Sequence, residues 1–147
     1  YGNDTAWRMC VDLMRIIHFA DKEGNLQNHQ QRKLFSIIDG VIGGENKGPL
    51  TPDPKPAGVL VGGDNLLAVD IVATRLMGFD PFKLKQYQYM LSFSDEFGFK
   101  GLNDIKVITL LDSQSVHTIE NCLLDKNNKF YDFKPYPGWV GHIEIGG

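Results

Sequence analysis

The sequence has few cysteines, no run of basic residues and no long apolar stretch. Its two cysteines, Cys10 and Cys122, are too few for an iron–sulfur cluster or a four-ligand zinc site. We expect two buried free thiols in a reducing compartment, and a Cys10–Cys122 disulfide is the alternative. Without basic clusters that alternate with aromatic residues, a nucleic-acid partner is not expected. No segment approaches the roughly 18 apolar residues of a membrane helix.

The composition is that of an ordinary globular domain. The chain has 147 residues, of which 42% are hydrophobic and 22% are charged, with a formal net charge of −3. A chain of this length can bury a substantial core, so we predict a single domain. The chain begins at Tyr1 without a methionine or a signal-like segment, which indicates a piece of a longer protein. We expect a cytoplasmic location.

The order of the predicted elements indicates an α/β fold. Apolar runs predict strands over residues 34–43, 58–63 and 105–111, and helical spacing predicts helices over residues 3–20, 65–77 and 80–92. We therefore expect a layered sheet of mostly buried strands with flanking helices. The single domain divides into an N-terminal helix (residues 1–24), an α/β core (33–111) and an irregular or extended tail (112–147). We predict a short helix or a strand over residues 116–124.

A glycine-rich loop follows the first predicted strand. Gly43, Gly44 and Gly48 allow the backbone to approach a ligand or to adopt a positive φ angle. Lys47 could meet an anion, and Glu45 could meet a cation or a proton. We interpret the loop as a ligand-binding loop, and a glycine-shaped turn with solvated charges is the alternative. It is not a phosphate-binding loop, because the G-x-x-x-x-G-K-[ST] pattern is absent.

Three carboxylates are candidates for catalysis. Asp70 lies on a predicted helix that is apolar on nearly every side, where a charge needs a partner. If the strands before Glu45 and before this helix are parallel neighbours, their loops meet at one edge of the sheet. Asp39, Glu45 and Asp70 would then gather into one acidic site that binds a divalent metal or holds a proton. The alternative is that they only brace loops.

The tail offers a weaker metal-binding pair. In an extended segment, His142 and Glu144 point to the same side, with a spacing that suits a metal or a proton relay. With Glu45 and Asp70 they complete the set of candidate metal ligands. Because no third nearby ligand is visible in the tail itself, surface exposure or docking of the tail is the alternative.

Four segments resemble one known family. They read SIIDGVIGGENKGPL, KPAGVLVGGDNLLAVDIVATRLMGFDP, GLNDIKVI and PGWVGHIE. They are similar to the carboxyl-terminal portion of the family called domain of unknown function 362, with its Gly-Glu-Gly-x-Gly-Pro loop and Met-Gly-x-Asp-Pro segment. The loop departs from the pattern at Asn46, which can replace glycine in a left-handed conformation. The helix start departs at Asn65-Leu66, which keeps a capping residue.

The resemblance implies limited functional expectations. Some members of the family are joined to ferredoxin-like iron–sulfur domains, so the implied partners are an amino-terminal half or a ferredoxin-like protein. We predict a small-molecule or metal-dependent enzyme domain with its acidic site at the glycine-rich loop. The alternative is a non-catalytic binding or scaffold domain that an amino-terminal half completes, which would show as an apolar face left open.

Overall fold

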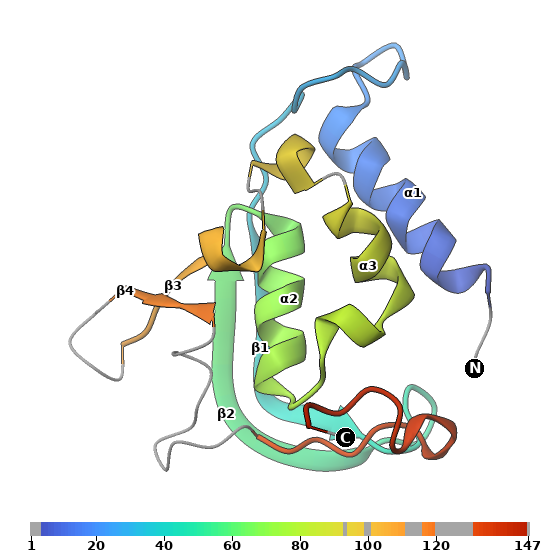
Figure 1. Ribbon diagram of the computed structural model, residues 1–147, viewed down its shortest axis with the longest axis vertical. Helices are drawn as coiled ribbons and strands as arrows, with labels where there is room; N and C mark the ends of the chain where they lie inside the picture. The colour runs from blue at the N-terminus through green and yellow to red at the C-terminus, as the bar shows by residue number, and fades with distance from the viewer. Residues whose placement is uncertain (1–3, 93, 99–100, 111–115, 120–130, 147) are drawn as a thin grey trace.

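The computed structural model describes residues 4–92, 94–98, 101–110, 116–119 and 131–146. Its helices and strands follow the order α1 (Ala6–Phe19), β1 (Ser36–Glu45), β2 (Asp53–Gly63), α2 (Leu66–Leu76), α3 (Lys85–Leu91), β3 (Lys106–Ile108) and β4 (Val116–Thr118). Figure 1 shows α2 lying along the β1–β2 sheet, with α3 beside it and α1 outside α3. The predicted mixture of helices and strands is confirmed. The predicted single sheet of mostly buried strands is wrong.

The strands form two separate antiparallel pairs. β1 pairs with β2 in a register that runs from Ser36 opposite Gly63 to Glu45 opposite Asp53, and β3 pairs with β4. The seven residues between β1 and β2 are too few for a parallel crossover, so an antiparallel hairpin is the only arrangement open to them. The apolar run that suggested a strand covered on both faces instead alternates in burial, with one side toward α2 and the other exposed.

Helix α2 packs against the inner face of the hairpin. Its Leu67 and Ile71 are completely buried, and both belong to a core that also contains residues of α1 and α3. The approach to the sheet is close, since a Cβ atom added to Gly63 would lie 2.9 Å from a methyl group of Val69. Gly63 therefore has to be small for the strand to turn directly into the helix.

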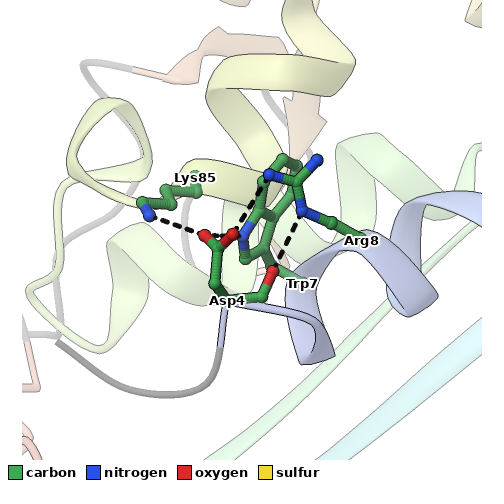
Figure 2. A network of polar contacts seen from close by, with 4 residues as sticks. All are labelled: Asp4, Trp7, Arg8 and Lys85. Carbon is green, nitrogen blue, oxygen red and sulfur yellow. Dashed lines mark hydrogen bonds and ion pairs between the residues drawn. The ribbon is translucent and has the colours of Figure 1, made fainter.

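Helix α1 is tied to α3 by one carboxylate. The helix predicted to begin at residue 3 begins at Ala6, and the residue at the cap position, Thr5, makes no side-chain cap bond. The Asp4 carboxylate instead accepts hydrogen bonds from Lys85 (2.9 Å), Trp7 (3.1 Å) and Arg8 (3.1 Å), as Figure 2 shows. These bonds, that of Lys85 above all, hold the pKa of Asp4 well below its ordinary value.

The helix predicted over residues 80–92 is broken near its start. Asp80 caps a turn of 3₁₀ helix (Pro81–Lys83) by accepting from the Phe82 amide at 2.9 Å, as a residue before proline should. Leu84 is then extended, and α3 begins only at Lys85. Gly78, which follows the end of α2, has a φ angle of +91°, the left-handed conformation in which glycine commonly ends a helix.

The described part of the tail packs against the C-terminal end of α2. The amides of Tyr131 and Phe133 donate to the carbonyls of Leu76 and Met77, at 3.0 and 2.8 Å, and the Ile145 amide donates to Gly78 at 2.9 Å. These bonds satisfy carbonyl groups that the end of a helix leaves without partners. Phe79, Phe133 and Ile143 form a second small core beneath them.

The cysteine prediction is only partly tested. Cys10 has no disulfide partner within the described part of the chain, and it is exposed on α1, so its predicted burial is wrong. Cys122 lies outside the described residues, and the alternative disulfide therefore stays untested. None of the helices within the described ranges combines the length and the hydropathy that crossing a bilayer requires.

The first prediction concerns the start of α2. The Asn65 side chain accepts from the Ala68 amide at 3.0 Å, as predicted for the cap, and its amide group also donates to the Phe97 carbonyl. We expect Asn65→Ala to lower the free energy of unfolding by about 1–2 kcal/mol. Asn65→Asp keeps the cap but loses the donor, so its loss should be smaller. Urea denaturation measures both, and an unchanged midpoint for Asn65→Ala would contradict the assignment.

Candidate functional site

The glycine-rich loop is shaped by packing as well as by backbone freedom. A Cβ atom on Gly43 would lie 2.7 Å from the Phe133 ring, and one on Gly44 would lie 2.9 Å from Pro52. Both glycines therefore leave room for neighbouring segments of the same chain. Asn46 has a φ angle of +66°, which confirms the predicted left-handed residue.

Glu45 joins the hairpin to the tail. Its side chain is only 8% exposed and accepts a hydrogen bond from the Lys134 amide at 3.0 Å. The ammonium groups of Lys55 and Lys134 lie 3.7 and 3.8 Å from its oxygens. Two ammonium groups and a backbone donor therefore already surround this carboxylate. This arrangement matches the alternative in which Glu45 braces the loop.

A cavity of about 350 Å³ lies between the loop and the tail. The loop contributes Gly44, Glu45, Asn46 and Gly48, and the tail contributes Tyr136 and Trp139. Phe79 and Gln86 complete much of the wall. The predicted ligand-binding loop therefore borders a cavity with aromatic walls and a polar edge. Lys47 does not line this cavity and is exposed.

The antiparallel hairpin does not bring Glu45 and the start of α2 to one edge. Glu45 lies opposite Asp53 at one end of the hairpin, whereas Gly63, which leads into α2, lies opposite Ser36 at the other end. The expectation of parallel neighbouring strands, on which the shared acidic site depended, is therefore wrong. Asp39 lies between the two ends, on the exposed side of β1, and accepts a hydrogen bond from the Val41 amide at 3.0 Å.

Asp70 occupies a half-buried position between helices. Burial raises the pKa of its carboxyl group, and within the described part of the chain no hydrogen bond or ion pair reaches that group. The Tyr87 hydroxyl lies nearby and is hydrogen-bonded to that of Thr74 at 3.1 Å. Burial, and secondarily the charge of Asp70, raises the pKa of Tyr87 to about 12. The ionised form of Asp70 is thus disfavoured by its burial beside the helical core.

His142 and Glu144 lie in a turn and not in an extended strand. Gly141 has a φ angle of +79°, and the Glu144 carboxylate accepts from the amides of Gly141 (2.9 Å) and Ile143 (3.1 Å). These bonds, that of Gly141 first, lower the pKa of Glu144. Among the described residues, no group of three or more His, Cys, Asp or Glu side chains is placed to hold a metal ion. The predicted divalent metal therefore stays a prediction.

Sequence reasoning missed an exposed apolar surface on the β1–β2 hairpin. We define the outer face as the side of the β1–β2 hairpin that turns away from α2, with its large side chains Phe35, Ile37, Val41, Ile42 and Leu60. Ile37 is 68% exposed and Leu60 is 66% exposed. Phe35 and Ile37 lie together, since a Cβ atom on Gly62 would contact both side chains. Asp39, within the apolar run, was the signal that one side of this strand is not buried.

Comparisons with protein-family models, with curated proteins and with solved structures found no match to this chain. The resemblance to domain of unknown function 362 therefore stays a prediction.

The second prediction concerns Asp70. Its folded-state pKa is raised above the ordinary value of 3.8, so the unfolded chain ionises first as the pH rises. Ionisation of Asp70 therefore lowers the free energy of unfolding. This loss is absent below the unfolded pKa, where Asp70 is protonated in both states. We expect Asp70→Asn to raise the melting temperature at pH 7 and to have little effect below pH 3.8. Thermal unfolding across this range measures the difference. A variant that is less stable at pH 7 would contradict this account.

Proposed function

We propose that this chain is a non-catalytic protein-binding module and that the outer face is its binding surface. The observation that carries the proposal is the exposure of five large apolar side chains on one side of one hairpin. Monomeric soluble proteins rarely leave such groups gathered on one surface, and contiguous exposed patches commonly mark sites of association. The open apolar face is the feature expected of a domain that another polypeptide completes.

The hairpin itself indicates what kind of surface binds there. On its inner face, half-buried Val59 and Val61 alternate along β2 and pack toward α2. The outer face is also apolar: Ile37 lies opposite Gly62, which has no side chain, and Leu60 lies beside them on β2. Helix α2 already covers the inner face. A second helix, supplied by the partner, would bury the apolar outer face as α2 buries the inner one, since an apolar sheet face is stable only when another element covers it.

A single charge on the outer face narrows the partner further. Asp39 is exposed and lies opposite Leu60, among otherwise apolar neighbours. A carboxylate that becomes covered needs an opposite charge, or the association loses affinity. The partner helix should therefore present an aliphatic stripe interrupted by one lysine or arginine. An amino-terminal half and a ferredoxin-like protein, the partners that the family resemblance implies, are the candidates to supply this helix.

The third prediction tests this surface by photo-crosslinking. A photoreactive amino acid at position 37 should crosslink one protein in an extract of the source cells, and the crosslinked peptide should be an amphipathic helix with one basic residue. The same amino acid at position 50 is the matched control, because Leu50 is 92% exposed but lies in the loop off the outer face. A synthetic copy of the peptide should then bind the purified chain.

Variants decide whether the binding follows the proposed chemistry. Ile37→Lys should weaken binding of the synthetic peptide at least about tenfold, because it places a charge in the apolar contact. Leu50→Lys should leave the affinity unchanged. Asp39→Lys should also weaken binding, and a peptide whose basic residue is replaced by glutamate should restore it. Equal crosslinking at positions 37 and 50, or a peptide that does not bind, would overturn the proposal.

A second candidate function is small-molecule binding or catalysis at the cavity beside the glycine-rich loop. The observation that favours it is the joint lining of that cavity by the loop and by Tyr136 and Trp139. Planar side chains such as these provide large apolar contact area for a flat ligand, and Asn46 could orient its polar groups.

The fourth prediction tests this candidate with planar aromatic fragments. A fragment that binds should shift the amide resonances of Gly44, Asn46 and Gly48 and the indole resonance of Trp139. Trp7, the other tryptophan, lies on α1 and is the internal control. Glu45→Gln should weaken fragment binding if the carboxylate faces the ligand. If the variant displaces the tail but binds the fragment equally well, Glu45 has only a structural role. Resonance shifts at residues outside the cavity would refute the candidate function.

A further inference from the structure

A second cavity of about 350 Å³ lies on the other side of β2 from β1. One wall is β2 from Val59 to Gly63, and the opposite wall is the segment from Ile105 to Thr109, which contains β3. Helix α2 forms the floor with Ala68, Val69, Val72 and Leu76. Figure 1 shows β3 and β4 on this side of β2, with β1 on the other. The cavity therefore follows the edge of β2 that β1 does not cover.

This edge carries backbone groups that can form hydrogen bonds. Along a strand, every second residue directs its N–H and C=O groups toward one neighbour, and the residues between direct theirs to the other side. Within the described ranges, β1 is the one strand that pairs with β2, and no other hydrogen bond to the backbone of residues 59–63 is seen. The second set of donors and acceptors therefore faces the cavity, where burial without partners is costly.

Nothing in this part of β2 discourages another strand from pairing with it. Natural edge strands are commonly protected by lysine, proline or a charged side chain. In β2 these residues are confined to its first part, with Asp53, Pro54, Lys55 and Pro56. The cavity lies beside the later part, Val59 to Gly63, which has no charge and no proline. The open edge is therefore short and lies beside an apolar floor.

We propose that the edge of β2 between Val59 and Gly63 binds an extended peptide segment of another protein as an added strand. Backbone hydrogen bonds to β2 would select an extended chain, as in other cases of strand addition. Alternate side chains of the peptide would point to the α2 floor, where Ala68, Val72 and Leu76 favour aliphatic residues of moderate size. The site is the edge of the sheet and goes beyond the proposed function: Leu60 borders both sites, but Ile37 lies only on the outer face.

The test uses a synthetic peptide with the sequence Lys-Val-Thr-Val-Thr-Val-Lys, acetylated and amidated at its ends. In an extended peptide, the valine amides point to one edge and the threonine amides to the other. Two analogues, N-methylated either at the valines or at the threonines, therefore block one edge each. We expect one analogue to lose affinity at least about tenfold and the other to bind like the parent peptide.

Amide hydrogen exchange locates the contact on the protein. The peptide should slow exchange at alternate residues between Val59 and Gly63, namely those whose N–H groups point away from β1. Ala68→Leu, which fills the floor, should weaken binding, whereas Ala73→Leu on the same helix but outside the cavity should not. Melting curves verify that both variants are folded. Equal binding by both N-methylated analogues, or unchanged exchange along β2, would overturn the proposal.

Ile37→Lys separates this site from the outer face. The variant should bind the synthetic strand peptide with unchanged affinity, since Ile37 does not line the cavity. Loss of helical-peptide binding with retained strand-peptide binding would support two independent sites. Loss of strand-peptide binding in this variant would mean that the edge is not a separate site, and would overturn the inference while leaving the outer face intact.

Discussion

The whole arrangement depends on a helix that has no polar face. In α2 the apolar residues Leu67 and Ile71 are fully buried, and even Thr74 and Arg75 have almost no exposure. A helix that is apolar on nearly every side is stable in water only when other elements surround it. The hairpin covers one side of α2, and α3 with α1 covers another. The remaining elements are therefore best understood as covers for α2 and for its two ends.

The ends of α2 impose a second constraint, because each end of a helix leaves backbone groups without partners inside the helix. At the start, Asn65 satisfies one amide and links the helix to Phe97. At the end, the tail supplies the amides of Tyr131 and Phe133. Glu45 then holds the same part of the tail against the hairpin. The glycine-rich loop is thus part of the support of the helix, which explains why its glycines contact Phe133 and Pro52 so closely.

Local features were predictable from sequence, whereas the pairing of the strands was not. The cap at Asn65, the left-handed Asn46 and the stop at Gly78 depend on the conformational preferences of single residues. The hairpin depends on where β2 begins. Its first residues include Pro54 and Pro56, which suggested a loop, although proline is tolerated on the edge of a strand. Because the predicted strand covered only residues 58–63, the pairing of the first half of β2 with β1 was missed, and the expectation of parallel strands, on which the acidic site depended, was wrong.

The correction of the pairing changes what the three carboxylates can do. In parallel strands they would have shared one site and repelled one another. In the antiparallel hairpin, Glu45 is balanced by two lysines, Asp70 lies half-buried among helices, and Asp39 is exposed on the outer face. A carboxylate paired with lysines inside the fold, such as Glu45, helps to hold the structure together. A buried carboxylate without a partner in the described part of the chain, such as Asp70, lowers stability. An exposed charge ringed by apolar groups does neither, so it can be used for recognition. Of the three, Asp39 is the one that stays exposed among apolar side chains, and this is why we propose the outer face as the binding surface.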